Sequence, residues 1–395
     1  MSITPRRRPY QVPIASVTMQ LALGGIYAWS TFAMPLKSAH GLSSAQAQLI
    51  FGLTVGTMVV GEIVSGRWQR RYGPRRVALL GAAFFACGYL VAGHSRGSFP
   101  VLLAGIGLLG GLGAGLAYLC PITSCVQWWP ERKGLITGVA LAGYGAGAIV
   151  LATAARIAFN HGWDVLRCFS WMGPVWGGVV ALSALFLSVP PLAEGEEAPP
   201  WPRFRELARQ REYWGLVVGM YCLSFAGLTV IGSLEPMGRA AGLAPALATL
   251  AISLLAVGNS LGRVSWGWVH DRIGRPTVPL ALAGAALGAL AMLAWGQSRP
   301  GYLAAAALTG LMYSGCTVLF VAEGASLWGP HLVGMIYPFL TIYNGLAALT
   351  GPAITGALFD RTGSYAAGLI LSAVVAGVGA VVVARWPWAT SPPSL

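Results

Sequence analysis

Long apolar stretches separated by short polar ones run through the whole chain. A helix needs about 20 apolar residues to cross the hydrocarbon core of a bilayer. Twelve stretches approach or exceed that length, at roughly residues 11–36, 44–66, 77–94, 99–124, 134–159, 166–189, 213–237, 243–267, 277–296, 300–323, 332–358 and 364–385. The pattern predicts an all-α membrane protein with twelve transmembrane helices.

One longer polar connector, "PPLAEGEEAPPWPRFRELARQRE", interrupts this pattern near the middle of the chain. It begins acidic and proline-rich and ends basic. We therefore expect an N-terminal six-helix bundle over residues 1–189, a cytoplasmic linker over 190–212 and a C-terminal six-helix bundle over 213–395.

The composition supports a lipid-facing surface. Apolar residues make up 56% of the chain and charged residues only 9%, whereas a soluble domain has about 25% charged residues. Too few charges remain to cover a surface in contact with water, which excludes an ordinary soluble protein.

The net charge of +13 suggests nucleic-acid binding only until its placement is considered. Lysine and arginine gather in one set of alternate loops, as in "GRWQRRYGPRR", and are sparse in the other set. This asymmetry follows the positive-inside rule. It predicts a multi-pass protein of the cytoplasmic (inner) membrane with both termini in the cytoplasm, and no nucleic-acid partner.

The two halves of the sequence resemble each other at a shift of about 201 residues. "GRWQRRYGPRR" aligns with "GWVHDRIGRP", so that Gly66 coincides with Gly267 and Gly73 with Gly274. A similar shift pairs "WPERKGLITG" with "GPHLVGMIYP". Repeated halves of this kind predict a binding site between them, near the middle of the bilayer.

The second copy of the repeated loop resembles the G-x-x-x-D-R-x-G-R motif of major facilitator transporters. The matching residues are Gly267, Asp271, Arg272, Gly274 and Arg275. The resemblance implies the major facilitator fold, in which this motif locks neighbouring helices in the outward-facing state. The first copy has Arg70 in place of the acid and Pro74 in place of the last basic residue, so we expect the lock mainly in the second half.

Three stretches resemble the oxalate/formate antiporter family and its bacterial monocarboxylate (lactate) transporter homologues: "GGIYAWSTF", "GLGAGLAYLCPITSCVQWWPERKGLITG" and "GNSLGRVSWGWVHDRIGR". The resemblance implies a carrier of small carboxylates. It implies a substrate-binding arginine at Arg263 and aromatic site residues at Tyr27, Tyr118 and Tyr144. The family's second cation, a lysine, falls on Asn344, which favours a monocarboxylate over a dianion.

Arg263 is unusual in its own right because it places a fixed charge within an apolar span. An intramembrane arginine is a candidate for function by default, and its planar fork fits a carboxylate. Asn259 lies one helical turn before it. The alternative is structural: the side chain extends to the cytoplasmic interface, since Asp271 is only about two turns away.

Glu62 is the counterpart of Arg263 at the shift of 201 residues. We consider two roles for it. The first is functional: Glu62 carries a proton or forms a gate between the halves. The second is structural: it pairs with Arg67, Arg70 or Arg71 at the end of its span.

No residue pattern points to a metal, a cofactor or an enzyme. The histidines lie at loops or span ends without a ligand-like cluster, and the six cysteines have no zinc or disulfide spacing. The glycine runs lie inside apolar spans, where close helix packing explains them. For each tyrosine, helix packing competes with substrate contact as the explanation.

The sequence therefore predicts a secondary active transporter for small monocarboxylates such as L-lactate or pyruvate, working by proton-coupled symport and alternating access. Its partners are the substrate, protons and the lipid bilayer, and we expect a monomer. The main alternative is a carboxylate exchanger of the oxalate/formate type. A membrane receptor or enzyme on the same scaffold is an alternative of another class, and a channel is a third, although a single arginine with aromatic neighbours fits a binding site better than a conducting ring.

Overall fold

The computed structural model describes residues 9–42, 44–191 and 204–388, and within these ranges it contains helices and no strand. The first part of the chain forms α1 (Gln11–Leu23), the 3-10 helix η1 (Gly24–Ala28), α2 (Trp29–His40), α3 (Ser44–Gly93), α4 (Phe99–Leu102), the π-helix η2 (Leu103–Gly110), α5 (Gly111–Trp128), the 3-10 helix η3 (Pro130–Arg132), α6 (Lys133–Asn160) and α7 (Val165–Ala184). The second part forms α8 (Phe204–Leu207), α9 (Arg211–Ala240), α10 (Pro245–Ile273), α11 (Thr277–Trp295), α12 (Arg299–Tyr313), α13 (Gly315–Trp328), the 3-10 helix η4 (Pro330–Leu332), α14 (Val333–Thr362) and α15 (Ala366–Ala384).

The number of membrane-crossing helices depends on how three elements are counted. In the described ranges nine helices are long and apolar enough to cross a membrane, or ten if the pair around the 45° bend after α1 counts as one span. Helix α3 covers two predicted spans and is kinked at Gly73, where φ is 78°. Helix α10, which carries Arg263 and the loop motif, is not among the nine. The count of twelve stays a prediction.

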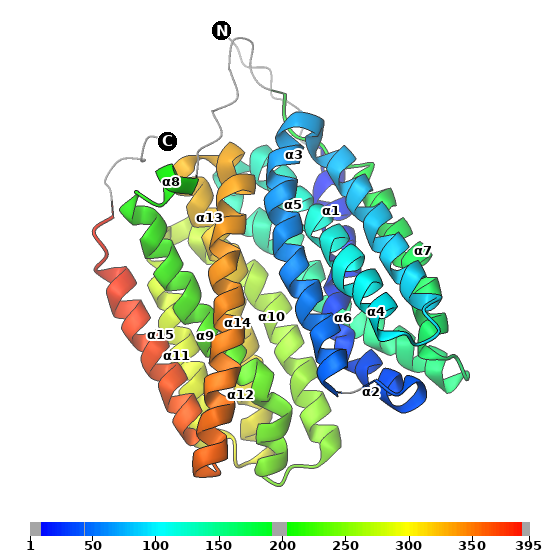
Figure 1. Ribbon diagram of the computed structural model, residues 1–395. Coiled ribbons are helices and arrows are strands. Elements are labelled where there is room, and N and C mark those ends of the chain that lie inside the picture. Colours follow the sequence, from blue (N-terminus) through cyan, green and yellow to red (C-terminus); the bar gives the residue numbers. More distant parts are fainter. Residues whose placement is uncertain (1–8, 43, 192–203, 389–395) are drawn as a thin grey trace.

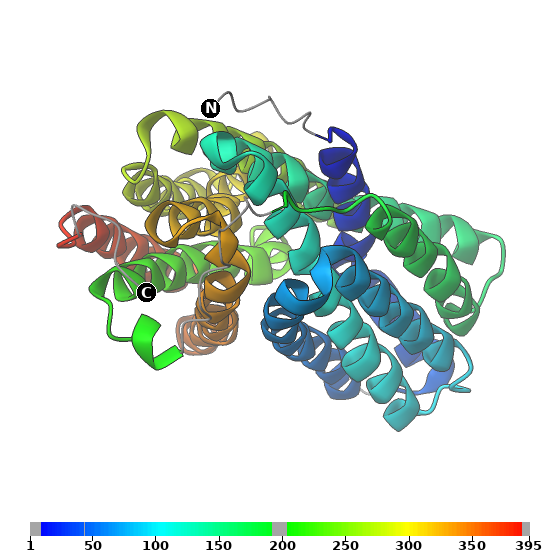
Figure 2. The same cartoon turned by 90° about the horizontal axis from the view of Figure 1, so that it is seen from above.

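Two groups of helices stand side by side in the molecule. The helices from α1 to α7 lie on one side and those from α9 to α15 on the other (Figure 1), and the view along the helices shows the same separation (Figure 2). Most of the predicted linker, residues 192–203, lies outside the described residues. The bundle boundaries of 1–189 and 213–395 stay a prediction.

Helix α1 begins and α15 ends at the same end of the molecule, at the top of Figure 1. We call this the terminal end. Two contacts tie the chain together there. The ring of Tyr10 lies 6.3 Å from that of Trp129, and Trp386 Nε1 donates to the carbonyl oxygen of Arg211 at 3.0 Å.

The two groups of helices meet along α6 and α10 and along α3 and α14. Glycine makes close approach possible at both places. A Cβ built on Gly66 would overlap the carbonyl oxygen of Gly334, and one on Gly267 would overlap that of Gly134. Gly66 and Gly267, which coincide in the sequence repeat, thus each contact the opposite half through its backbone.

Candidate functional site

Arg263 is buried where α10 packs against α6, with 4% of its surface exposed. Its Nε donates to Asn259 Oδ1 at 2.9 Å, and its Nη1 donates to the carbonyl oxygen of Leu141 at 3.0 Å. Asn259 reaches it because residues four apart lie on one face of a helix. Two neutral acceptors therefore hold the guanidinium group in place and leave other N–H groups for a ligand.

No carboxylate in the described ranges forms an ion pair with Arg263. The ring of Tyr144 lies 5.6 Å from the guanidinium carbon, and such a ring face attracts a cation. Neither the ring nor the two neutral acceptors cancels a full charge. The site is therefore a buried, positioned cation that favours an anion.

Two predicted tyrosines lie together, and one of them, Tyr144, lies beside Arg263. Tyr118 on α5 and Tyr144 on α6 are buried, and their rings meet edge to face with centroids 5.1 Å apart. Tyr337 of α14 lies within hydrogen-bonding reach of Tyr118. The ring of Tyr144 therefore begins an aromatic cluster with hydroxyl groups next to the cation, and apolar walls with a few polar groups are the usual character of a small-molecule site. The side chain of Tyr27, the third predicted tyrosine, lies outside the described residues.

Asn344 is joined to the site through Cys316, a residue that sequence reasoning missed. Cys316 of α13 is buried and lies close enough to Arg263 for the guanidinium charge to act on its sulfur. Its Sγ lies 3.9 Å from Asn344 Oδ1 and 2.8 Å from the hydroxyl of Ser224 on α9. The site thus draws on four helices of the second half.

Glu62 is also buried, with 3% of its surface exposed. Its carboxylate accepts a hydrogen bond from Thr341 Oγ1 of α14 at 3.1 Å. Among the described residues it makes no ion pair, including with the three arginines considered from sequence. This hydrogen bond joins α3 to α14 and therefore connects the two groups of helices.

The residues of the loop motif make a second cluster, at the terminal end. Asp271 accepts from the backbone N–H of Gly134 at 2.8 Å and of Leu135 at 2.7 Å. These are among the first N–H groups of α6, which have no partner within the helix, and a carboxylate is favoured there by the helix dipole. Asp271 therefore fastens α10 to the start of α6.

The other residues of the motif make contacts within the second half of the molecule. Arg275 pairs with Glu323, which also accepts from or donates to His270 Nε2 at 3.1 Å according to protonation. Arg272 lies over the ring of Trp268, 3.5 Å from its centroid, and Gly274 has a φ of 67°. The sequence pattern did not indicate that Glu323 takes part in this network.

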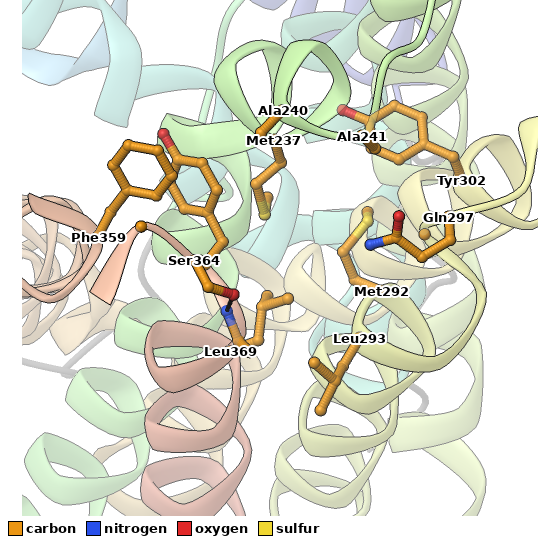
Figure 3. A pocket seen from close by; sticks show the side chains of 14 residues that line it. Met237, Ala240, Ala241, Met292, Leu293, Gln297, Tyr302, Phe359, Ser364 and Leu369 are labelled. Carbon is orange, nitrogen blue, oxygen red and sulfur yellow. Dashed lines mark hydrogen bonds between the residues drawn. The ribbon is translucent and has the colours of Figure 1, made fainter.

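A hollow of about 160 Å³ lies at the other end of the second group of helices, between the ends of α9, α11, α14 and α15. Figure 3 shows the side chains of Met237, Met292 and Tyr302 around it. None of the predicted site residues lines it. The candidate site is therefore the cluster around Arg263.

We expect Asp271→Asn to loosen the start of α6. An amide has one acceptor oxygen in place of two, and it lacks the charge that strengthens both hydrogen bonds. Loss of a hydrogen bond to a charged group costs about 1.5–3 kcal/mol. Hydrogen exchange measured by mass spectrometry should therefore become tenfold or more faster at the amides of Gly134 and Leu135.

Asp164→Asn is the matched control, because Asp164 Oδ2 caps α7 by accepting from the N–H of Leu166 at 3.1 Å. This variant should leave exchange at the start of α6 unchanged. Unaltered exchange there in Asp271→Asn would contradict the fastening role.

Comparison with known proteins gives relatives over most of the chain. The profile of the Major Facilitator Superfamily matches residues 14–337 and 216–395. The oxalate:formate antiporter of Oxalobacter formigenes is 26% identical over 92% of this chain and 88% of its own length. Monocarboxylate transporter 13 of Bos taurus is 22% identical over 92% of this chain and 85% of its own.

Solved structures agree on the fold. The fucose:proton symporter of Escherichia coli superposes with a TM-score of 0.74 at 14% identity, covering 97% of this chain and all of that one. A human organic anion transporter gives a TM-score of 0.70 at 18% identity over 96% of this chain. With a family profile that spans the sequence and a shared helical fold, the chain belongs to the Major Facilitator Superfamily.

Proposed function

We propose that the protein is a secondary active transporter of small monocarboxylates, of the size of L-lactate or pyruvate, and that it couples their movement to protons. The observation that carries this proposal is the buried guanidinium of Arg263, which is held by neutral groups and has no described carboxylate beside it. A monocarboxylate would supply one negative charge and two acceptor oxygens to that group.

The relatives support the same class of substrate. Their names include an oxalate:formate antiporter, monocarboxylate transporters and the apicoplast pyruvate carrier 1 of Toxoplasma gondii, which is 23% identical over 72% of this chain. Asn344 is neutral, so one cation faces the substrate, which favours a monoanion over oxalate.

In the proposed cycle the two six-helix bundles rock about Arg263 within the cytoplasmic membrane. With both termini in the cytoplasm, the terminal end faces the cytoplasm, and the state described has its halves in contact there. The lock around Asp271 would hold this outward-facing state. Asn259, Tyr118, Tyr144 and Tyr27 would complete the substrate pocket.

Glu62 is the proposed proton carrier. It lies at the contact between α3 and α14, so alternation of the halves would change its surroundings. A buried carboxylate without a cation is costly, whereas a protonated carboxyl group is tolerated. Uptake of one proton with one monocarboxylate would make transport electroneutral.

The test is uptake of radiolabelled L-lactate into proteoliposomes. We expect accumulation when an inward proton gradient is imposed and loss of accumulation when a protonophore collapses it. The second candidate, a carboxylate exchanger, is favoured by the likeness to the oxalate:formate antiporter. Uptake that ignores the gradient and requires formate inside the vesicles would establish exchange and reject symport.

Glu62→Gln separates the proton from the substrate in the same assay. The amide keeps an acceptor oxygen for Thr341 but carries no transported proton. We expect gradient-driven accumulation to be lost and lactate counterflow to persist, while Glu206→Gln, on exposed α8, behaves as wild type. Gradient-driven accumulation in Glu62→Gln would remove Glu62 from the proton path.

A further inference from the structure

The turn within α3 forms a groove at the terminal end that the proposed transport cycle does not use. The groove has a volume of about 360 Å³ and is lined by Trp68, Tyr72, Arg76, Val77 and Leu80. It lies at the kink at Gly73, where the chain leaves one apolar helix and enters the next. One side of the groove is therefore formed by a polar turn and the other by an apolar helix.

The polar side is strongly basic. Five arginines occur within ten residues and all are exposed: Arg67, Arg70, Arg71, Arg75 and Arg76. The sequence contains no aspartate or glutamate between Glu62 and Glu131. The local positive charge is therefore not balanced by acids of the same segment.

The corresponding turn of the second half is balanced internally. There Asp271 contacts the start of α6, and Arg275 pairs with Glu323. In the first half Arg70 occupies the position of the acid and Pro74 that of the last arginine. The two turns share a backbone shape but differ in charge, and only the first carries an excess of arginine without an acid in its own segment.

Two exposed aromatic side chains lie on the same turn as these arginines. Trp68 is 41% exposed and Tyr72 is 43% exposed. Their rings meet edge to face at 6.5 Å, and the guanidinium of Arg71 lies 5.3 Å from the ring of Tyr72. Tryptophan and tyrosine with arginine are the residues that proteins place at the headgroup level of a bilayer.

We propose that this groove binds an anionic phospholipid. Arg76 contacts the phosphate, its neighbouring arginines supply the attracting field, and an acyl chain follows the exposed Leu80 along the second limb of α3. An amphiphile is required because the groove joins a cationic turn to an apolar helix surface. Clusters of four to eight basic residues beside a membrane span recognise anionic lipid in this way.

The test compares the full-length protein in detergent with added dioleoyl phosphatidylglycerol or dioleoyl phosphatidylcholine, by native mass spectrometry and by thermal unfolding. We expect one phosphatidylglycerol to remain bound and to raise the unfolding midpoint, with a smaller effect of phosphatidylcholine. Arg75→Gln with Arg76→Gln should weaken apparent affinity about thirtyfold.

Arg205→Gln with Arg209→Gln is the matched control, since it removes two exposed arginines near the same end but outside the groove. It should keep the bound lipid. Equal loss of bound lipid in both double variants would overturn the proposal, because general surface charge would then explain the binding. An equal rise of the midpoint with inorganic phosphate alone would also overturn it, because the ligand would then be a free anion.

Discussion

Replacing Arg263 with glutamine is expected to abolish saturable lactate uptake without unfolding the protein. Truncating one partner of a buried, hydrogen-bonded charge pair costs about 2–5 kcal/mol. Uptake at low substrate concentration should therefore fall about thirtyfold or more. Arg263→Lys should retain a small part of the activity, because lysine keeps the charge but cannot form the two parallel hydrogen bonds of a guanidinium group.

Thermal unfolding distinguishes a lost binding site from a lost fold. Arg263 is a buried charge with no counter-ion among the described residues. In the absence of substrate, Arg263→Gln should therefore leave the unfolding midpoint unchanged or raise it. If lactate is the substrate, a concentration 100 times its dissociation constant should stabilise the wild type by about 2.7 kcal/mol, and this increment should vanish in Arg263→Gln.

Arg156→Gln is the control for charge removal, because Arg156 is exposed on α6. It should transport lactate as the wild type does. If Arg263→Gln transported lactate normally and was stabilised by it, the arginine would be structural and the proposed site would be wrong.

Replacing Gly66 with alanine is expected to force the halves apart at the terminal end. The new methyl group would overlap the carbonyl oxygen of Gly334, and a backbone atom cannot rotate away as a side chain can. Overpacking of this kind costs about 1–3 kcal/mol. The ratio of closed to open molecules at this end should therefore fall about 5- to 150-fold.

Electron–electron double resonance measures this shift between nitroxide labels at Arg132 and Arg385, one exposed position in each half. Cys87 and Cys222 are first replaced by serine, because they are the native cysteines that are not buried. Gly66→Ala should enlarge the long-distance population.

Gly56→Ala is the matched control on the same helix, since a Cβ there meets nothing within 4 Å. It should keep the wild-type distances. Identical distance distributions in Gly66→Ala and Gly56→Ala would show that the glycine contact does not hold the halves together.

The sequence repeat marked segments that lie at the contact between the halves, although it did not predict the contacts themselves. It aligned Gly66 with Gly267 and the segment before α6 with the segment before α14, and both glycines contact the opposite half at those segments. The loop motif likewise directed attention to Asp271, whose carboxylate fastens α10 to α6.

Several partners were beyond the reach of sequence reasoning for one physical reason. In a soluble helix, apolar residues mark the buried face, but a lipid-facing helix is apolar on both faces. Nothing in the pattern therefore indicated that Thr341 faces Glu62 or that Cys316 and Ser224 approach Asn344.

The breaks inside helices were equally hard to foresee. The 3-10 segment Gly24–Ala28 falls within one predicted apolar stretch, and the π-helix Leu103–Gly110 within another. Glycines are frequent throughout this chain, 54 in all, so a glycine by itself marks no break. The backbone of Gly24 packs so closely on that of Tyr144 that tertiary contact decides the geometry there.

The charge of Arg263, which has no ion pair among the described residues, has a consequence for how tightly such a carrier would be coupled. A ligand shifts a conformational equilibrium only by its difference in affinity between states. A carrier that holds a proton on Glu62 but no substrate would have to occlude a bare cation, whereas one that holds both occludes a neutral pair. In the return step the ionised Glu62 would offset the charge of Arg263, so the empty carrier could still cross while little of the proton gradient leaked away.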